Sequence, residues 1–334
     1  MDPERTWAEK STAVIQAAVL APSSHNTQPW IFRVSETAVD LVADGSRALP
    51  ANDPEDRELV ISCGCALLNL RLAALEEGFD PEIQLLPESG DPRVLARVRL
   101  SAVPKMGKPE MGKEVGRDGV SAPELVPFME TRRTVRDPFK DEPVNRETLH
   151  VLEEAASAEG ARLQPVLQNG NRGRLAALIA EGDRVQWADA SWRRELAAWM
   201  RPRKRGEGLT VPLLAAPIAR LVIRTFDMGK RMAGKDRELA EDSPLLAVLN
   251  TGSDEREDWL TAGQALQRVL LAGCREGLQA SYLNQPVQVQ KLRPRLQELV
   301  GGGTPQVVLR LGFPKEDPPA SPRRPLEAVM EWVH

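Results

Sequence analysis

Residues 57–78 read RELVISCGCALLNLRLAALEEG, and residues 256–277 read REDWLTAGQALQRVLLAGCREG. At a constant offset of 199 positions, and without a gap, the second stretch repeats Arg57, Glu58, Gly64, Ala66, Leu67, Leu72, Ala73, Glu77 and Gly78. Each stretch has apolar residues at the spacing of a helix and a glycine at its C-terminal end. The sequence therefore predicts two similar helices. The glycine shared near the start of each favours copying over a chance likeness.

A second pair of helices supports the duplication. Thr12–Ala21 and Thr148–Ala158 both have helical apolar spacing, and each is followed by a Gln-Pro pair. The offset there is only about 137 positions, so the second copy contains about 62 additional residues, which we place in an excursion at about 170–243. An insertion of this length is often a lid over a site. An arm that covers a partner is the alternative, and the sequence leaves both open.

The remaining pattern predicts an α+β fold. Strands and helices do not strictly alternate, which favours helices packed on antiparallel-rich sheets. We expect strands at 30–34, 38–43, 82–86, 96–101, 164–168, 245–251 and 305–312, and helices at 12–21, 57–77, 146–158, 172–183, 259–276 and 289–299. Residues 105–123, rich in Gly, Lys and Pro, read as a linker between a first half, 1–125, and a second half, 126–334.

Composition excludes several classes of protein. The net charge of −4 argues against nucleic-acid binding by bulk charge. No apolar run approaches the ~18 residues of a membrane span, and the N-terminus lacks the pattern of a signal peptide. Three cysteines cannot make a disulfide framework, and three histidines without metal-ligand spacing predict no metal site. Phosphate-binding glycine motifs of the Rossmann and P-loop kinds are absent. We expect a cytoplasmic protein with no nucleic-acid or membrane partner.

The first chemical motif is APSSHNTQPW at residues 21–30. Pro22 ends a helix, and the following side chains offer several hydrogen-bond donors and acceptors within a few residues beside an apolar wall. A planar heteroaromatic ring with carbonyl and ring-nitrogen edges needs such a set. A capped loop whose polar groups satisfy one another would have the same composition.

Two basic motifs complete the set. TRRTVR at residues 131–136 places three guanidiniums and two hydroxyls together, and arginine forks match phosphate oxygens. Prolines around Arg323 and Arg324 keep the C-terminal segment extended, so both arginines could reach one anion. Taken singly, the first could be a solvated basic turn and the second a disordered tail. Together the three motifs indicate a ligand with a flat polar ring and a phosphate, a description that fits FMN.

These residues resemble the flavin-dependent nitroreductase family. The resemblance is carried by the APSSHNTQPW string, by RRTVRDPF at 132–139 and by the strand QVVLRLG at 306–312. The layout is most like the fused, actinobacterial Acg-like branch of the family, whose members are described as NAD(P)H nitroreductases. It covers nearly the whole chain except the linker and the excursion. It implies a nitroreductase-like fold, with two copies fused in one chain as an intramolecular pseudo-dimer.

The resemblance also implies which residues hold the cofactor. Family members are homodimers in which a serine-rich loop of one subunit and an arginine motif of the other meet around one FMN. Here the loop is intact only in the first half and the arginine motif only in the second, which implies one working site and one lost site. The implied cofactor-binding residues are Ser23, Ser24, His25, Asn26, Thr27 and Gln28 at the ring, and Arg132, Arg133, Arg136, Arg323 and Arg324 at the phosphate end. No side chain need act as a catalytic acid or base.

The implied function is that of an oxidoreductase. NAD(P)H would reduce FMN, which would reduce a nitroaromatic, a quinone or a similar small-molecule acceptor. The alternative is an FMN storage or sequestering protein whose excursion closes the site. The sequence identifies neither the acceptor nor the preferred nicotinamide cofactor. It also leaves open whether the chain is a monomeric pseudo-dimer or dimerises further.

Overall fold

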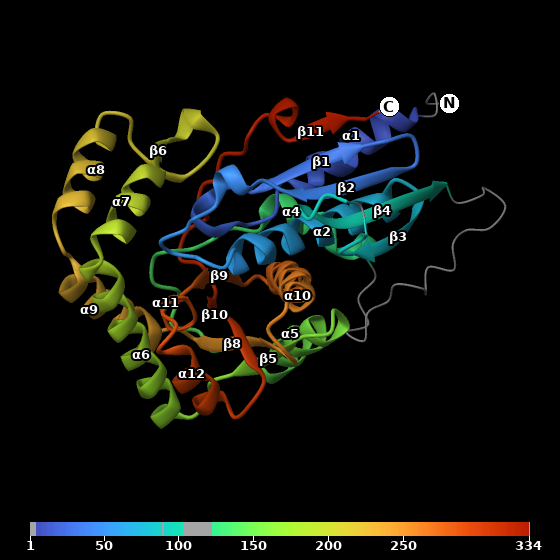
Figure 1. The fold of residues 1–334 in the computed structure, drawn as a ribbon. Helices are drawn as coiled ribbons and strands as arrows, with labels where there is room; N and C mark the ends of the chain where they lie inside the picture. Colours follow the sequence, from blue (N-terminus) through green and yellow to red (C-terminus); the bar gives the residue numbers. More distant parts are fainter. Residues whose placement is uncertain (1–4, 89, 103–121, 334) are drawn as a thin grey trace.

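The computed structural model describes residues 5–88, 90–102 and 122–333, which form two antiparallel-rich sheets around a helical centre (Figure 1). The first sheet has the order β11-β1-β2-β4-β3. Its strands are β1 (Trp30–Val34), β2 (Ala38–Ala43), β3 (Phe79–Leu85), β4 (Val94–Ala102) and β11 (Met330–Trp332). The predicted linker lies mostly outside the described residues. The α+β expectation is confirmed.

The second sheet repeats the strand order of the first. Its order is β5-β8-β10-β9, with all neighbours antiparallel. Its strands are β5 (Arg162–Pro165), β8 (Leu245–Thr251), β9 (Gln279–Tyr282) and β10 (Thr304–Gly312). When β11 and the excursion strands β6 (Met200–Pro202) and β7 (Leu209–Val211) are left out, four strands of each half follow the same order, first-second-fourth-third. The sequence analysis did not predict β9 or β11.

The two repeated helices lie against each other at the centre of the molecule (Figure 1). They are α2 (Arg57–Glu76) and α10 (Arg256–Arg275). Around them lie α1 (Trp7–Ala18), α3 (Ala122–Leu125), α4 (Phe128–Thr131) and α5 (Arg146–Ala158). One hydrophobic core contains buried side chains of α2, α10 and both sheets, so the two halves fold around a shared interior.

Helix α2 bears on the sequence expectation that no apolar run approaches the length of a membrane span. It is long and apolar enough to cross a membrane by length and composition, although its arginine and acidic residues interrupt any continuous apolar run. The structure buries 89% of the apolar window inside the protein. The apolar character of α2 is therefore that of a central core helix, enclosed by helices and strands of both halves.

The excursion is mostly helical and forms one side of the molecule (Figure 1). It consists of α6 (Asn169–Ala188), α7 (Ala190–Trp199), β6 (Met200–Pro202), β7 (Leu209–Val211), α8 (Ala216–Thr225) and α9 (Gly229–Glu241). Helices α6 and α9 pack on each other, and α7 packs on α8. The helix expected at 172–183 is present as the longer α6, and a separate apolar cluster that includes Trp187, Trp192 and Ile223 joins α6, α7 and α8.

The C-terminal segment returns to the first half. After β10 the chain forms a short 3₁₀ helix (Leu326–Ala328) and then β11, which pairs in parallel with β1 through Phe32 and Met330. The remaining helices, α11 (Gln285–Gln288) and α12 (Arg293–Val300), lie between β9 and β10 in the chain. The tail therefore carries Arg323 and Arg324 past the loop that follows α1.

Candidate functional site

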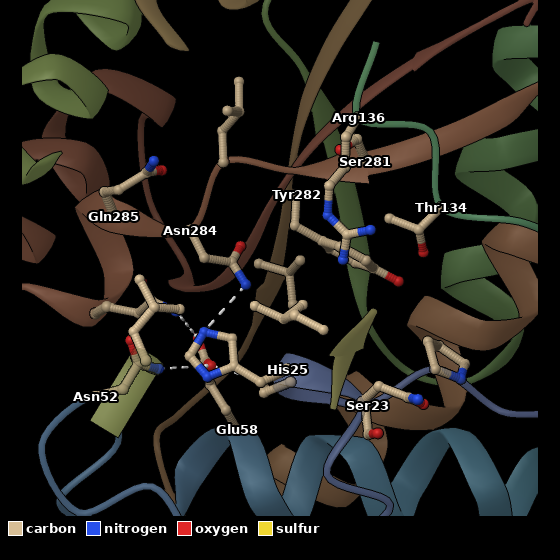
Figure 2. A pocket seen from close by; sticks show the side chains of 18 of the residues that line it. Ser23, His25, Asn52, Glu58, Thr134, Arg136, Ser281, Tyr282, Asn284 and Gln285 are labelled. Carbon is tan, nitrogen blue, oxygen red and sulfur yellow. Dashed lines mark hydrogen bonds between the residues drawn. The ribbon is translucent and has the colours of Figure 1, made fainter. Parts of the chain in front are cut away.

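A cavity of about 380 Å³ lies where both halves and the excursion meet. This volume is in the range of small-molecule and cofactor sites. The first half contributes the loop after α1 and one face of α2, the second half contributes residues 132–136 and 281–288, and the excursion contributes α6, α7 and α9. Figure 2 shows side chains from the two halves directed toward one another across this space.

The loop at residues 23–28 contains three residues whose backbone lies in the left-handed region. His25, Asn26 and Gln28 have φ values of 50°, 54° and 52°, a conformation that costs energy for residues with a side chain. The Gln28 N–H donates to Ser23 Oγ at 2.9 Å, and the Ser24 N–H donates to Ser62 Oγ at 3.3 Å. These bonds hold the strained loop, which brings Ser23, Ser24, His25 and Asn26 to the cavity wall.

His25 lies on the cavity wall as a neutral imidazole. Burial lowers its pKa to about 4. In the part of the chain that the structure describes, its buried Nδ1 has no hydrogen-bond partner. A neutral imidazole with a free ring nitrogen can accept or donate one hydrogen bond to a ligand, which fits the expected hydrogen-bonding role better than acid–base work at neutral pH.

Arg132 is the most informative of the predicted arginines. Its side chain is buried, and its Nη2 donates to the Leu20 carbonyl oxygen at 3.4 Å. Among the described residues neither its Nε nor its Nη1 has a partner. Burial lowers its pKa, yet no carboxylate balances its charge within hydrogen-bond distance in the described chain. A buried guanidinium with unpaired nitrogens on a cavity wall is a site for an anion.

Arg136 and Arg323 lie on the same cavity wall. Arg323 reaches it from the C-terminal tail, and its guanidinium donates to the carbonyl oxygens of Val19 at 2.6 Å and Leu20 at 2.8 Å. Burial, together with the nearby charges of Arg132 and Arg133, lowers the pKa of Arg323 to about 9. Arg132 and Arg323 donate to the same Leu20 carbonyl oxygen, so these two cations lie close together at one end of the cavity.

Four of the predicted residues are not among those that line the cavity. They are Thr27, Gln28, Arg133 and Arg324. The Gln28 side chain is buried and donates to the Gly206 carbonyl oxygen at 2.8 Å, while its Oε1 accepts from the Arg324 N–H at 2.9 Å. The Arg324 guanidinium donates to the Gln28 carbonyl oxygen at 3.0 Å. These bonds tie the loop to the excursion and to the tail.

Arg133 is turned onto its own backbone. Its Nη1 donates to the carbonyl oxygens of Glu130 and, at 3.0 Å, of Arg132, while its backbone N–H donates to Gln279 Oε1 at 2.7 Å. Its guanidinium therefore stabilises the end of α4. Of the three arginines in the motif, Arg132 and Arg136 remain available to a ligand.

Sequence reasoning missed Glu58, which binds the cavity residues together. Its carboxylate accepts from Ser24 Oγ at 2.7 Å, from Gln288 Nε2 at 2.9 Å, and from Asn52 and Asn284 at 3.3 and 3.4 Å (Figure 2). The donors come from three separate segments of the chain, since Asn284 directly precedes the short helix α11 that ends at Gln288. Glu58 was visible only as a member of the repeat, because nothing local marks a helix residue as a partner for distant amides.

Sequence reasoning also missed the contribution of β9 and the residues after it. Ser281, Tyr282, Asn284 and Gln285 all lie on the cavity wall (Figure 2). Burial raises the pKa of Tyr282 above its usual range, and in the described residues its hydroxyl has no hydrogen-bond partner. The strand is only four residues long, too short for a clear alternation in the sequence.

The excursion adds two carboxylates to the wall. Gln285 Nε2 donates to Asp183 Oδ1 at 3.1 Å and to Asp236 Oδ2 at 2.8 Å. Burial, together with the neighbouring carboxylate of Asp236, raises the pKa of Asp183 to about 7. Asp183 Oδ2 is without a partner within the described ranges. The excursion helices thus contribute polar groups to the cavity as well as covering it.

A metal or a thiol nucleophile has no support among the residues described. They hold no cluster of three His, Cys, Asp or Glu side chains that could bind a metal. Burial raises the pKa of Cys65 to about 12 and that of Cys63 beyond the usual range of thiols, so both stay protonated at neutral pH. The cavity offers hydrogen bonds and positive charge.

Comparisons with known proteins identify the family of the chain. Residues 129–312 match the model of the nitroreductase family. The chain is 30% identical over 335 residues to "Putative NAD(P)H nitroreductase Rv3131" of Mycobacterium tuberculosis, covering 97% of this chain and 92% of that protein. It is also 30% identical over 326 residues to "Putative NAD(P)H nitroreductase acg" of the same organism, with coverages of 95% and 94%.

Among solved structures, nitroreductase A from Vibrio parahaemolyticus aligns with 62% of this chain and 74% of its own at 16% identity and a TM-score of 0.38. The conclusion on family membership therefore depends on the sequence matches, which extend over most of both chains. This protein belongs to the nitroreductase family.

Proposed function

We propose that the chain is an FMN-binding oxidoreductase of the nitroreductase type that uses NAD(P)H to reduce a nitroaromatic, a quinone or a similar acceptor. The observation that carries the proposal is the buried Arg132 guanidinium, whose Nε and Nη1 lack partners among the described residues at the wall of the cavity. Arg136 and Arg323 stand at the same wall, so this end of the cavity fits a phosphate.

The rest of the cavity fits the ring system of FMN. Further buried polar atoms that lack partners in the described chain belong to its wall, namely His25 Nδ1, Tyr282 Oη, Asp183 Oδ2, Gln285 Oε1 and Arg310 Nε. Buried polar groups are nearly always hydrogen-bonded. This number of unpaired polar atoms around one cavity therefore indicates a polar ligand. The donors and acceptors lie among apolar side chains such as Ile61, Leu266 and Val307, as a flat heteroaromatic ring requires.

The chain's own residues would bind and orient the cofactor. FMN, when bound, supplies the hydride chemistry between NAD(P)H and an acceptor. Arg132 and Arg136 would hold its phosphate, and Ser23, His25 and Asn26 would fix its ring. Helices α6, α7 and α9 would exclude water from the site. None of these tasks needs a protein nucleophile or metal.

We further propose that the two halves are fused, diverged copies that share this one site. The shared order of four strands in the two sheets and the central pairing of the repeated helices support it. At the equivalent place beside α10, Gly160 approaches Thr261, the counterpart of Ser62 at the offset of 199. There Glu159 accepts a hydrogen bond from Arg71 at 2.6 Å. An ion pair in that position is consistent with a second site that has been lost.

The structure also favours one alternative, an FMN storage protein. Trp187 and Trp192 of the excursion lie on the cavity wall, and the loop at 206–208 is bonded to Asn26 and Gln28. Such a cover could retain FMN and exclude a second substrate.

One experiment separates these functions. The purified protein is examined for visible absorption, and the released cofactor is identified by mass spectrometry. NADPH and NADH are then added without oxygen. Loss of the flavin absorption band, and its return with a nitroaromatic or quinone, supports the oxidoreductase. A yellow protein that neither nucleotide bleaches supports storage. A colourless protein that does not take up added FMN contradicts both.

A further inference from the structure

Helix α8 exposes an apolar face that no other part of the described chain covers. Ile218 and Leu221 lie on one face of α8, and Leu214 lies in the turn just before the helix, at an i, i+4, i+7 spacing with them. Leu214, Ile218 and Leu221 are 89%, 67% and 64% exposed. Leu213 and Phe226 flank this face and are more than half exposed. The opposite side of the helix, with Ala216 and Ile223, is buried toward α7. Scattered exposed side chains need no explanation, but a continuous apolar face does.

The segment that carries this face is strongly basic. Residues 201–231 contain eight basic side chains against the acidic Glu207 and Asp227, although the whole chain has a net charge of −4. Glu207 is already paired with Arg47 and Arg201. The basic side chains that are exposed are Arg203, Lys204, Arg205, Arg220, Arg224, Lys230 and Arg231.

From this combination we infer that the α8 face, defined as Leu213, Leu214, Ile218, Leu221 and Phe226, docks on an anionic phospholipid bilayer. An amphipathic helix lies in a membrane interface when its apolar side enters the boundary between headgroups and acyl chains and its basic residues attract anionic headgroups. The α8 face supplies the apolar side, and Arg220 and Arg224 lie on the same helix.

The charges disfavour a second copy of the chain as the occupant. In a two-fold interface the same patch is present on both partners, so Arg220, Arg224 and their basic neighbours would face like charges. A bilayer containing phosphatidylglycerol presents negative charge and an apolar interior together. The sequence expectation of no membrane partner considered only apolar runs, and an amphipathic surface does not produce one.

The inference is independent of the proposed function, but it places the site with respect to the bilayer. Helix α8 packs on α7, and α7 carries Trp192 and Leu196 on the cavity wall. A docked α8 face would therefore hold the cover of the cavity against the membrane surface, from which a lipid-soluble acceptor could be drawn.

The test is flotation of the purified full-length chain with vesicles. Vesicles of phosphatidylcholine alone are compared with vesicles of equal parts phosphatidylcholine and phosphatidylglycerol. We expect binding to the second kind only, weakened by salt as charge attraction is screened. Leu214→Asp should reduce the bound fraction by about tenfold or more. Leu167→Asp, at a site that is 61% exposed elsewhere on the surface, should leave it unchanged.

Two charge-matched double variants test whether the basic residues near α8 contribute to membrane binding. Arg224→Glu with Lys230→Glu should abolish binding, whereas Lys140→Glu with Lys291→Glu, which makes the same change in net charge at other exposed positions, should not. The inference is overturned if the chain does not float with either vesicle. It is equally overturned if Leu214→Asp binds like the wild type, or if light scattering shows a dimer that this substitution dissolves. Circular dichroism of each variant confirms that it is folded.

Discussion

Gly64 of α2 and Gly263 of α10 face each other where the two repeated helices cross. A Cβ atom placed on Gly263 would lie 2.1 Å from the Ile61 carbonyl oxygen and 2.7 Å from Gly64 Cα. One placed on Gly64 would lie 2.4 Å from the Leu260 carbonyl oxygen. The residue that marks the repeat in the sequence is therefore the residue that lets the two backbones meet. Because both helices also carry cavity or core side chains, their spacing positions the site.

Alanine at either crossing glycine should destabilise the whole chain. Gly64→Ala and Gly263→Ala gain up to about 1 kcal/mol of helix propensity, but overpacking against backbone atoms costs typically about 1–3 kcal/mol. We expect a net loss for each in denaturant unfolding. Gly234→Ala in α9, where a Cβ meets nothing within 4 Å, should be neutral or stabilising. Equal stability of all three variants would contradict the close crossing.

Arg132 should determine the retention of FMN. Arg132→Gln removes the buried guanidinium, and hydrogen bonds to charged groups contribute about 1.5–3 kcal/mol. We therefore expect FMN to bind about tenfold to a hundredfold more weakly. The measurement is a titration of the apoprotein with FMN in which binding is monitored through the quenching of flavin fluorescence.

Arg133→Gln is the matched control, because the Arg133 guanidinium is bonded to carbonyl oxygens away from the cavity wall. It should bind FMN like the wild type. If Arg133→Gln is the weaker binder, the assignment of the phosphate end to Arg132 is wrong.

Glu195 should control how fast the site opens. Its carboxylate accepts from the backbone N–H groups of Ala51 and Asn52, both at 2.9 Å, and so fastens α7 to the first half. Trp192 Nε1 adds a bond to Asn52 Oδ1 at 3.0 Å. Glu195→Ala should speed the release of FMN, measured by dilution into excess apoflavodoxin or another flavin acceptor. Arg194→Ala, an exposed neighbour, should not change the rate.

Stability should depend on pH through Asp183. Its pKa of about 7 in the folded protein exceeds its ordinary value of 3.8, so the folded state retains a proton that the unfolded state has lost. Its contribution is therefore favourable below pH ~4, decreases as the pH rises toward 7, and is constant above that. The difference amounts to a few kcal/mol at most.

Asp183→Asn keeps the oxygen that accepts from Gln285 and cannot ionise. In the ligand-free protein we expect it to become more stable than the wild type as the pH rises from 4 to 7, measured by urea unfolding at each pH. Glu181→Gln, on the same helix, removes an exposed carboxylate that pairs with Arg295 and is the control. A constant difference between Asp183→Asn and the wild type across this range would show that Asp183 is not held protonated.

The periodicity of apolar residues was sufficient to predict helices and strands that bury a regular set of side chains. The strands at 30–34, 38–43 and 245–251 and the helix at 146–158 have the predicted bounds. It failed where elements are short or irregular. The four-residue β9 has too few positions to alternate, and β11 exists only because the tail meets β1. The expected helix at 289–299 is shorter in the structure, where α12 begins only at Arg293 and ends at Val300.

The candidate site shows the same division. The polar loop at 23–26, Arg132, Arg136 and Arg323 could be selected from the sequence because their residue types are unusual together, and the structure brings them to one cavity. The direction in which each side chain points could not be predicted from the sequence. Arg133 and Arg132 are neighbours of the same type, but only Arg132 is on the wall, because the chain turns at the end of α4.

By itself, the sequence determined the α+β class, the repeat and the family resemblance. Each of these depends on the local spacing of apolar residues or on a contiguous string of residues. Only the tertiary structure decided that Glu58 accepts hydrogen bonds from three distant segments and that the excursion contributes Asp183 and Asp236 to the cavity wall. It also decided that α8 leaves an apolar face exposed. The physical reason is that hydrogen bonding and burial depend on which distant segments meet. That meeting is set by the packing of α2 on α10 through Gly64 and Gly263.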